Sequence, residues 1–179
     1  MPASIRTWTL LLYTTIAFLG WACQAENTLH SPIFQDIFAQ GEGTFRGIFL
    51  QDDISVVKLK EADLPPLYED PLGISYKVQT SEGDEIYIEY YTPLGRSDQP
   101  LTQISSIVVN VVMREEGRAA SLYEEILGYL NQLHGVPQGS FEHHIWDGIL
   151  QAKTGTGMEV ILKLDDSKNK ITLNYISKP

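Results

Sequence analysis

The clearest β-strand signal in the chain is EIYIEYYT, residues 85–92. Isoleucine and tyrosine make up most of it, and β-branched and aromatic residues are enriched in strands. Successive side chains of a strand point to opposite faces of its sheet. Ile86, Ile88 and Tyr90 are therefore expected to face a hydrophobic core.

The alternate positions of the same stretch form a candidate binding face. Tyr87, Glu89 and Tyr91 are expected to line the side of the sheet that points away from the core. Tyrosine is enriched at protein interfaces, because it combines a large apolar ring with a polar tip. These three side chains are therefore expected to contact a protein partner. The alternative is that helices or a neighbouring segment cover this face as well.

Further strands are expected on both sides of this stretch. Each candidate is rich in apolar residues, several of them alternating with polar ones, and turn residues separate the candidates. The segments are ISYKVQT (74–80), ISSIVVNVVM (104–113), FEHHIW (141–146), MEVILKL (158–164) and ITLNYI (171–176). The polar run DDSKNK (165–170) is expected to be the hairpin turn between the last two strands.

The most regular helix is expected in SLYEEILGYLNQLHGVP, residues 121–137. Ser121 and Glu124 have the spacing of a capping box, and Gly135 suits the position after the last turn. His134 is expected to stabilise the C-terminal end of the helix through its positive charge. The core face is expected to consist of Leu122, Ile126, Tyr129, Leu130 and Leu133.

Two shorter helices are expected nearer the start of the chain. SPIFQDIFAQGEG (31–43) opens with a capping serine and a proline that suits the first helical position. A second helix is expected to run from Asp52 or Asp53 to about Glu61. The segment LPPLYEDPLG (64–73) is expected to end it, because proline is not tolerated in a helix interior.

The element order is a helix, three strands, a helix and three strands, which indicates the α+β class. Two halves, about 45–113 and 120–177, would each contain one helix-plus-three-strand unit. Side by side, the two units would form an antiparallel sheet backed by helices. Residues 31–179 are therefore expected to be a single α+β domain.

This element order, together with the loose pattern L…YLNQLHGVP…W, is similar to that of two kinds of bacterial envelope protein. One is the β-lactamase inhibitory protein, which is built from tandem helix-and-sheet units. The other is the small outer-membrane assembly lipoproteins, which pair helices with a three-stranded sheet. The resemblance implies a binding module, by analogy of fold.

The start of the chain, MPASIRTWTLLLYTTIAFLGWAC, has the layout of an export signal. Arg6 supplies positive charge, residues 7–19 are uncharged, and small residues precede Cys23. One interpretation of this signal is cleavage after Ala25 by an ordinary signal peptidase, which would release a secreted soluble protein. A single-pass anchor is the other alternative, but the apolar run is short for a membrane span.

LGWAC, residues 19–23, resembles the box at which bacterial lipoprotein signals are cut. Cys23 is the only cysteine, so it cannot form an internal disulfide. The resemblance implies that residues 1–22 are a signal peptide and that Cys23 carries a lipid anchor. Residues 23–30 would then be a tether, and Gln24 indicates an outer-membrane location facing the periplasm.

Composition and motifs disfavour several functions. The net charge of −10 disfavours binding to nucleic acid. None of the glycine-containing stretches follows a strand and opens a helix with the spacing of a phosphate-binding loop. His143 and His144 are adjacent on a predicted strand, so they would point to opposite faces and could not share one metal ion. No catalytic residue, metal site or cofactor is therefore expected.

The sequence thus favours a lipid-anchored cell-envelope protein that binds another protein without catalysis. Two alternatives stay open. One is an inhibitor or immunity-type protein of the envelope, whose acidic surface would suit a basic target. The other is a hydrolase or metal-dependent enzyme of an unfamiliar type.

Overall fold

The structure is a computed structural model that describes residues 30–38, 43–93, 102–115, 117–151, 154–165, 167 and 169–178. The helices and strands considered below belong to the unit Ser31–Pro179. The expected signal peptide (1–22), Cys23 and the tether before His30 lie outside the described residues.

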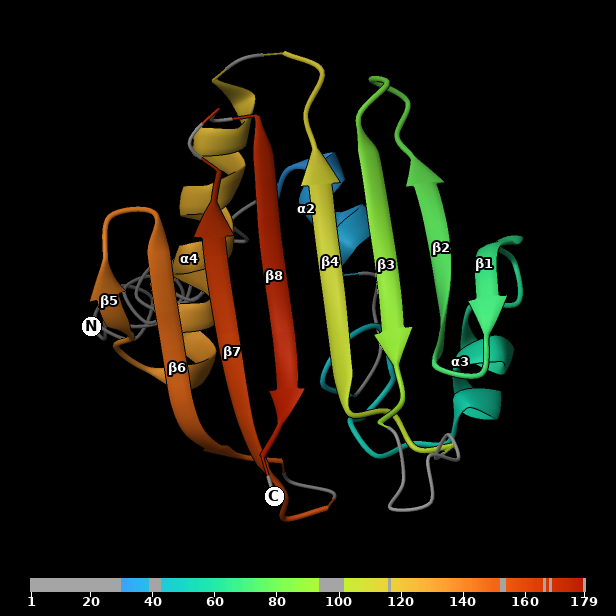
Figure 1. The fold of residues 1–179 in the computed structure, drawn as a ribbon. Coiled ribbons are helices and arrows are strands. Elements are labelled where there is room, and N and C mark those ends of the chain that lie inside the picture. Colours follow the sequence, from blue (N-terminus) through green and yellow to red (C-terminus); the bar gives the residue numbers. More distant parts are fainter. Residues whose placement is uncertain are drawn as a thin grey trace, which may run out of the picture. The chain divides into compact units, whose positions relative to one another are not determined.

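Within the described residues, eight strands form one antiparallel sheet in the order β1-β2-β3-β4-β8-β7-β6-β5 (Figure 1). The strands are β1 (Pro66–Asp70), β2 (Gly73–Gln79), β3 (Glu85–Tyr91), β4 (Ser106–Val112), β5 (Gln138–Ser140), β6 (His143–Leu150), β7 (Gly157–Leu164) and β8 (Lys170–Ser177). Each half of the chain forms a meander, and the two meanders join where β4 pairs with β8. The predicted α+β class and antiparallel sheet are confirmed.

The described helices are α2 (Pro32–Ile37), α3 (Ile54–Lys60) and α4 (Arg118–His134), and all lie on one face of the sheet (Figure 1). Ser31 caps α2 by accepting a hydrogen bond from the backbone N–H of Phe34. Asp53 caps α3 by accepting from the backbone N–H of Ser55. Both short helices therefore begin where the sequence predicts, because their caps are local to the chain.

The predicted count of three strands per half is wrong, because each half has four. The additional strands are the two edges of the sheet. β1 begins at Pro66, and proline is tolerated at the first residue of an edge strand. β5 has three residues and includes Gly139 at a φ of 106°. Neither segment has the apolar alternation by which a strand is recognised in a sequence.

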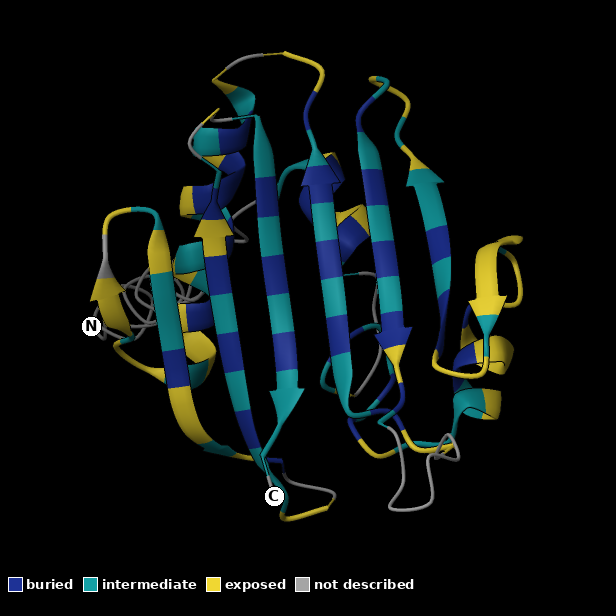
Figure 2. Ribbon diagram, in the orientation of Figure 1, coloured by how far each residue is buried: buried dark blue, intermediate teal, exposed yellow. Residues whose placement is uncertain are grey.

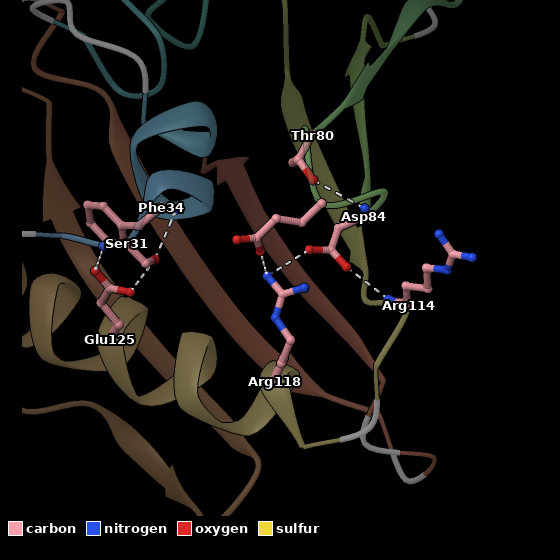
Figure 3. Close-up of polar contacts among 8 residues, drawn as sticks. Ser31, Phe34, Thr80, Asp84, Arg114, Arg118 and Glu125 are labelled. Carbon is pink, nitrogen blue, oxygen red and sulfur yellow. Dashed lines mark hydrogen bonds and ion pairs between the residues drawn. The ribbon is translucent and has the colours of Figure 1, made fainter.

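Helix α4 begins at Arg118, before the predicted start at Ser121. Gly117, with a φ of 86°, precedes the first turn, and no described side chain caps the helix. The predicted capping box of Ser121 and Glu124 is therefore wrong. Arg118 instead pairs with Asp84, in the turn between β2 and β3, at 3.0 Å between Nη2 and Oδ2 (Figure 3). This ion pair joins the start of α4 to a turn that is distant in sequence.

The buried face of α4 differs in part from the prediction. The buried residues are Ala119, Leu122, Tyr123, Ile126 and Leu130. Leu133 is expected in the core but is 56% exposed, because the last turns of α4 border a cavity. Earlier in the helix, both carboxylate oxygens of Glu125 accept hydrogen bonds from Ser31, at 2.8 Å from N and 2.6 Å from Oγ (Figure 3). These bonds attach the start of α2 to α4.

The core lies between the helices and the sheet face that they cover, named here the covered face. Along β3, β4, β7 and β8, buried side chains alternate with partly exposed ones, as the bands in Figure 2 show. Ile86, Ile88 and Tyr90 have no exposed surface, as the strand pattern predicts. The opposite side of the sheet is named here the open face.

Candidate binding face

The open face carries the side chains that alternate with the buried ones. Tyr87 and Glu89 are partly exposed, and Tyr91 is 41% exposed. The described helices all lie on the other side of the sheet (Figure 1). The structure therefore brings these three residues to one surface, and no described helix covers them.

Tyr87 is held in place by two charged neighbours. Its hydroxyl donates to Oε2 of Glu85 at 2.5 Å, and Lys77 Nζ donates to Oε1 of the same carboxylate at 2.6 Å. Lys77 Nζ also lies 5.3 Å from the centre of the Tyr87 ring, within the range of a cation–π contact. The bonds from Lys77 and then Tyr87 lower the pKa of Glu85. The Glu85 carboxylate is thus ionised at neutral pH, and its two hydrogen bonds hold Lys77 and Tyr87 in a defined geometry.

Tyr91 has a similar arrangement at the end of the strand. Its hydroxyl donates to Oε2 of Glu89 at 2.6 Å. This bond, followed by partial burial, raises the pKa of Tyr91 to about 12, so the phenol stays protonated at neutral pH. Tyr91 therefore presents its ring to solvent while its hydroxyl is directed along the strand.

Beside the tyrosines, the centre of the open face is a mixture of aliphatic and amide side chains. The strand register aligns Glu89, Val108, Asn174, Ile161 and Ile145 in one row across the sheet. Oδ1 of Asn174 is buried and has no hydrogen-bond partner among the described residues. Such a surface can form apolar contacts with a bound molecule.

The two adjacent histidines do lie on opposite faces, as predicted. His143 is exposed and pairs in register with Lys163 on the open face. His144 is partly buried on the covered face, where its Nδ1 lies 2.6 Å from the Tyr123 hydroxyl. Within the described residues, no group of three or more His, Cys, Asp or Glu side chains converges as a metal site would require.

Sequence reasoning did not identify Lys77, Glu85 or Asn174 as parts of this surface. Lys77 and Asn174 are polar positions that alternate with apolar ones in predicted strands, so the signal for their orientation was present. Their neighbourhood was not predictable, because it depends on which strands pair and in which register.

Comparison of the chain with models of protein families, with curated proteins and with solved structures found no match. A search for membrane-spanning helices, made over the described residues, found none with sufficient length and hydrophobicity.

Proposed function

We propose that this chain is a lipid-anchored protein of the bacterial cell envelope that binds another protein through the open face, without catalysis. The observation that carries the proposal is the pair of ordered tyrosines on a sheet face that no described helix covers. Tyrosines contribute strongly to interfaces, because they bury a large ring at a low cost in conformational entropy.

The electrostatics of the face favour one kind of partner surface. Glu89 lies beside Tyr91, whereas Glu85 is already paired with Lys77, and the whole chain carries a net charge of −10. A carboxylate beside an aromatic ring suits an arginine or lysine side chain, which forms charge-assisted hydrogen bonds and cation–π contacts. The expected partner is therefore a protein with a basic patch, as for an inhibitor or immunity-type protein.

Site-specific photo-crosslinking in cells tests the binding face. A photoreactive phenylalanine analogue would replace Tyr91 in one variant and Leu59 in a second, since Leu59 is 75% exposed on α3. We expect a discrete crosslinked product from position 91 and none from position 59. Equal crosslinking from both positions, or none from position 91, would contradict the proposal.

The membrane anchor is the second part of the proposal, and it is supported by the sequence alone. Cys23 follows an uncharged run and the small residue Ala22, and it is the only cysteine. Several acyl chains on one terminus give stable attachment to a bilayer, because each buried CH₂ contributes about 0.8 kcal/mol. With Gln24 after the cysteine, we place the protein at the outer membrane, facing the periplasm.

The intact mass of the native protein tests the anchor separately from the binding face. We expect a mature chain that begins at Cys23 and carries the mass of attached lipid. We expect Cys23→Ser to remain an uncleaved precursor, or to be cut after Ala25 and leave the membrane fraction. A mature chain that begins at Glu26 without added mass would show that the protein is secreted and soluble.

We also propose that the two halves of the sheet arose by duplication of one helix followed by a four-strand meander. The series α3-β1-β2-β3-β4 and α4-β5-β6-β7-β8 have the same order, and the strand order reverses about the β4–β8 pair. Superposition of β2–β4 on β6–β8 should bring their backbones into register except at the bulge between Trp146 and Ile149. A mismatch in strand tilt or register throughout would contradict a duplication.

A further inference from the structure

A cavity of about 570 Å³ lies on the helix side of the sheet, separate from the open face. Its walls come from the end of α2, the segment after it, the last turns of α4 and the ends of β6, β7 and β8. The apolar part of the lining includes Phe38, Phe49, Tyr129, Leu133, Ile149 and Met158. Cavities of 300–1,000 Å³ with apolar walls are typical of small-molecule sites.

One polar atom in this lining, Nε2 of Gln151, lacks a hydrogen-bond partner among the described residues. Gln151 is 6% exposed, and its Oε1 accepts a hydrogen bond from Thr44 Oγ1 at 2.9 Å. Its Nε2 is buried and has no hydrogen-bond partner among the described residues. Both Gln151 and Thr44 line the cavity. A buried N–H without an acceptor is unfavourable, so an acceptor atom on a bound molecule would be stabilised there.

The lining carries no formal charge at neutral pH. None of the described residues that line the cavity is Asp, Glu, Lys or Arg. Burial lowers the pKa of His134, which corrects the expectation of a charged histidine at the end of α4. Burial raises the pKa of Tyr129 and Tyr175, so both phenols stay protonated. An ion entering the cavity would lose hydration without meeting an opposite charge.

We propose that this cavity binds a small, uncharged and mainly apolar molecule whose carbonyl oxygen accepts a hydrogen bond from Gln151 Nε2. The apolar part of the molecule would lie against Phe38, Tyr129 and Leu133. An acyl ester has this chemistry, whether it comes from a membrane lipid or from a free molecule. The site lies on the opposite side of the sheet from the tyrosines, so it does not depend on the proposed binding face.

Nile red tests the site, because it is uncharged, carries a carbonyl oxygen and becomes fluorescent in apolar surroundings. We expect one bound dye per protein. Leu133→Trp should weaken binding at least about tenfold, because the larger side chain would occupy a cavity wall that is partly exposed. Leu59→Trp on α3 is the matched control, and it should bind the dye as the unaltered protein does.

Gln151→Met tests the hydrogen bond, because methionine has a similar length and no N–H. We expect it to weaken Nile red binding about tenfold, the equivalent of one good hydrogen bond. Thermal unfolding of each variant checks that the fold is retained. Equal binding by Leu133→Trp and the unaltered protein would overturn the site, and unchanged binding by Gln151→Met would overturn the role of Gln151.

Competition experiments identify the source of the ligand. Displacement of the dye by phosphatidylcholine vesicles would assign a membrane lipid, and displacement by dispersed monoolein alone would assign a free acyl ester. Oleate at neutral pH should displace it much less than monoolein, because oleate is charged. Stronger displacement by oleate than by monoolein would overturn the proposal of an uncharged ligand.

Discussion

Tyr90 and Tyr91 are neighbours on β3, and their hydroxyls make bonds of the same length to a glutamate. Tyr90 has no exposed surface and donates to Glu61 Oε1 at 2.6 Å, whereas Tyr91 is 41% exposed and donates to Glu89 Oε2 at 2.6 Å. The two bonds differ in whether water can take the place of the glutamate when that side chain is removed. Water can replace the acceptor of Tyr91, but not that of Tyr90, so the covered face depends more strongly on its polar partners for stability.

The covered face has a buried ion pair at this point. Glu61 is 3% exposed, and its two carboxylate oxygens accept from Nε and Nη2 of Arg46 at 2.8 and 3.0 Å. Arg46 Nη1 also donates to the backbone carbonyl of Asp36 at 2.7 Å. The end of α3, the segment before it and β3 are therefore joined through one carboxylate. Removal of one partner from such a pair leaves a buried charge uncompensated.

The largest expected effect is that of Glu61→Ala. It should lower the free energy of unfolding by about 3–5 kcal/mol, because Arg46 and Tyr90 lose their acceptor in a buried site. Urea unfolding measures the change. Glu89→Ala is the matched control on the open face and should cost less than about 0.5 kcal/mol. Similar losses from the two variants would mean that the two faces do not differ as described.

Tyr90→Phe should have the next largest effect. It removes one hydroxyl from a buried network and should cost about 1–3 kcal/mol, while Tyr91→Phe should be nearly neutral. A double-mutant cycle of Tyr90→Phe with Glu61→Gln measures the coupling between the two side chains. A coupling indistinguishable from zero would show that the bond between Tyr90 and Glu61 does not contribute to stability.

Replacing both tyrosines of the open face by alanine should separate stability from binding. Tyr87→Ala with Tyr91→Ala is expected to lower unfolding free energy by only about 1 kcal/mol, because both rings are partly exposed on a sheet face. Partner binding should weaken by more than about 2 kcal/mol if the tyrosines are hot spots. Thermal unfolding measures the change in stability, and the affinity of the purified double variant for the partner identified by crosslinking measures the change in binding. A large loss of stability would assign the tyrosines to the core.

The smallest expected effect is a pH dependence from Glu85. Bonds from Lys77 and Tyr87 lower its pKa in the folded protein below the ordinary value of 4.5. The stability it contributes is present above pH 4.5 and is lost as the pH falls through the folded pKa. Glu85→Gln and Lys77→Met should therefore each reduce the slope of melting temperature against pH below 4.5. An unchanged slope in both variants would contradict this assignment.

The predictable part of the fold and of the site was local in sequence. Alternation along EIYIEYYT placed Tyr90 on one face and Tyr91 on the other, and the caps Ser31 and Asp53 located two helix starts. Local patterns also predicted the six longer strands and the α+β class. These features were accessible because a strand's side-chain period and a cap's hydrogen bond each involve only a few neighbouring residues.

The rest was decided by contacts between residues far apart in the chain. Arg118, the first residue of α4, forms an ion pair with Asp84. Glu125 accepts a hydrogen bond from Ser31, which is 94 residues away in the chain. The edge strands β1 and β5 exist because their neighbours offer unpaired backbone groups, although their own sequences lack alternation. Local alternation was therefore enough to predict which way each side chain of β3 points. Which side chains share a surface, an ion pair or a cavity depends on strand pairing and register, and these are set by contacts across the whole domain.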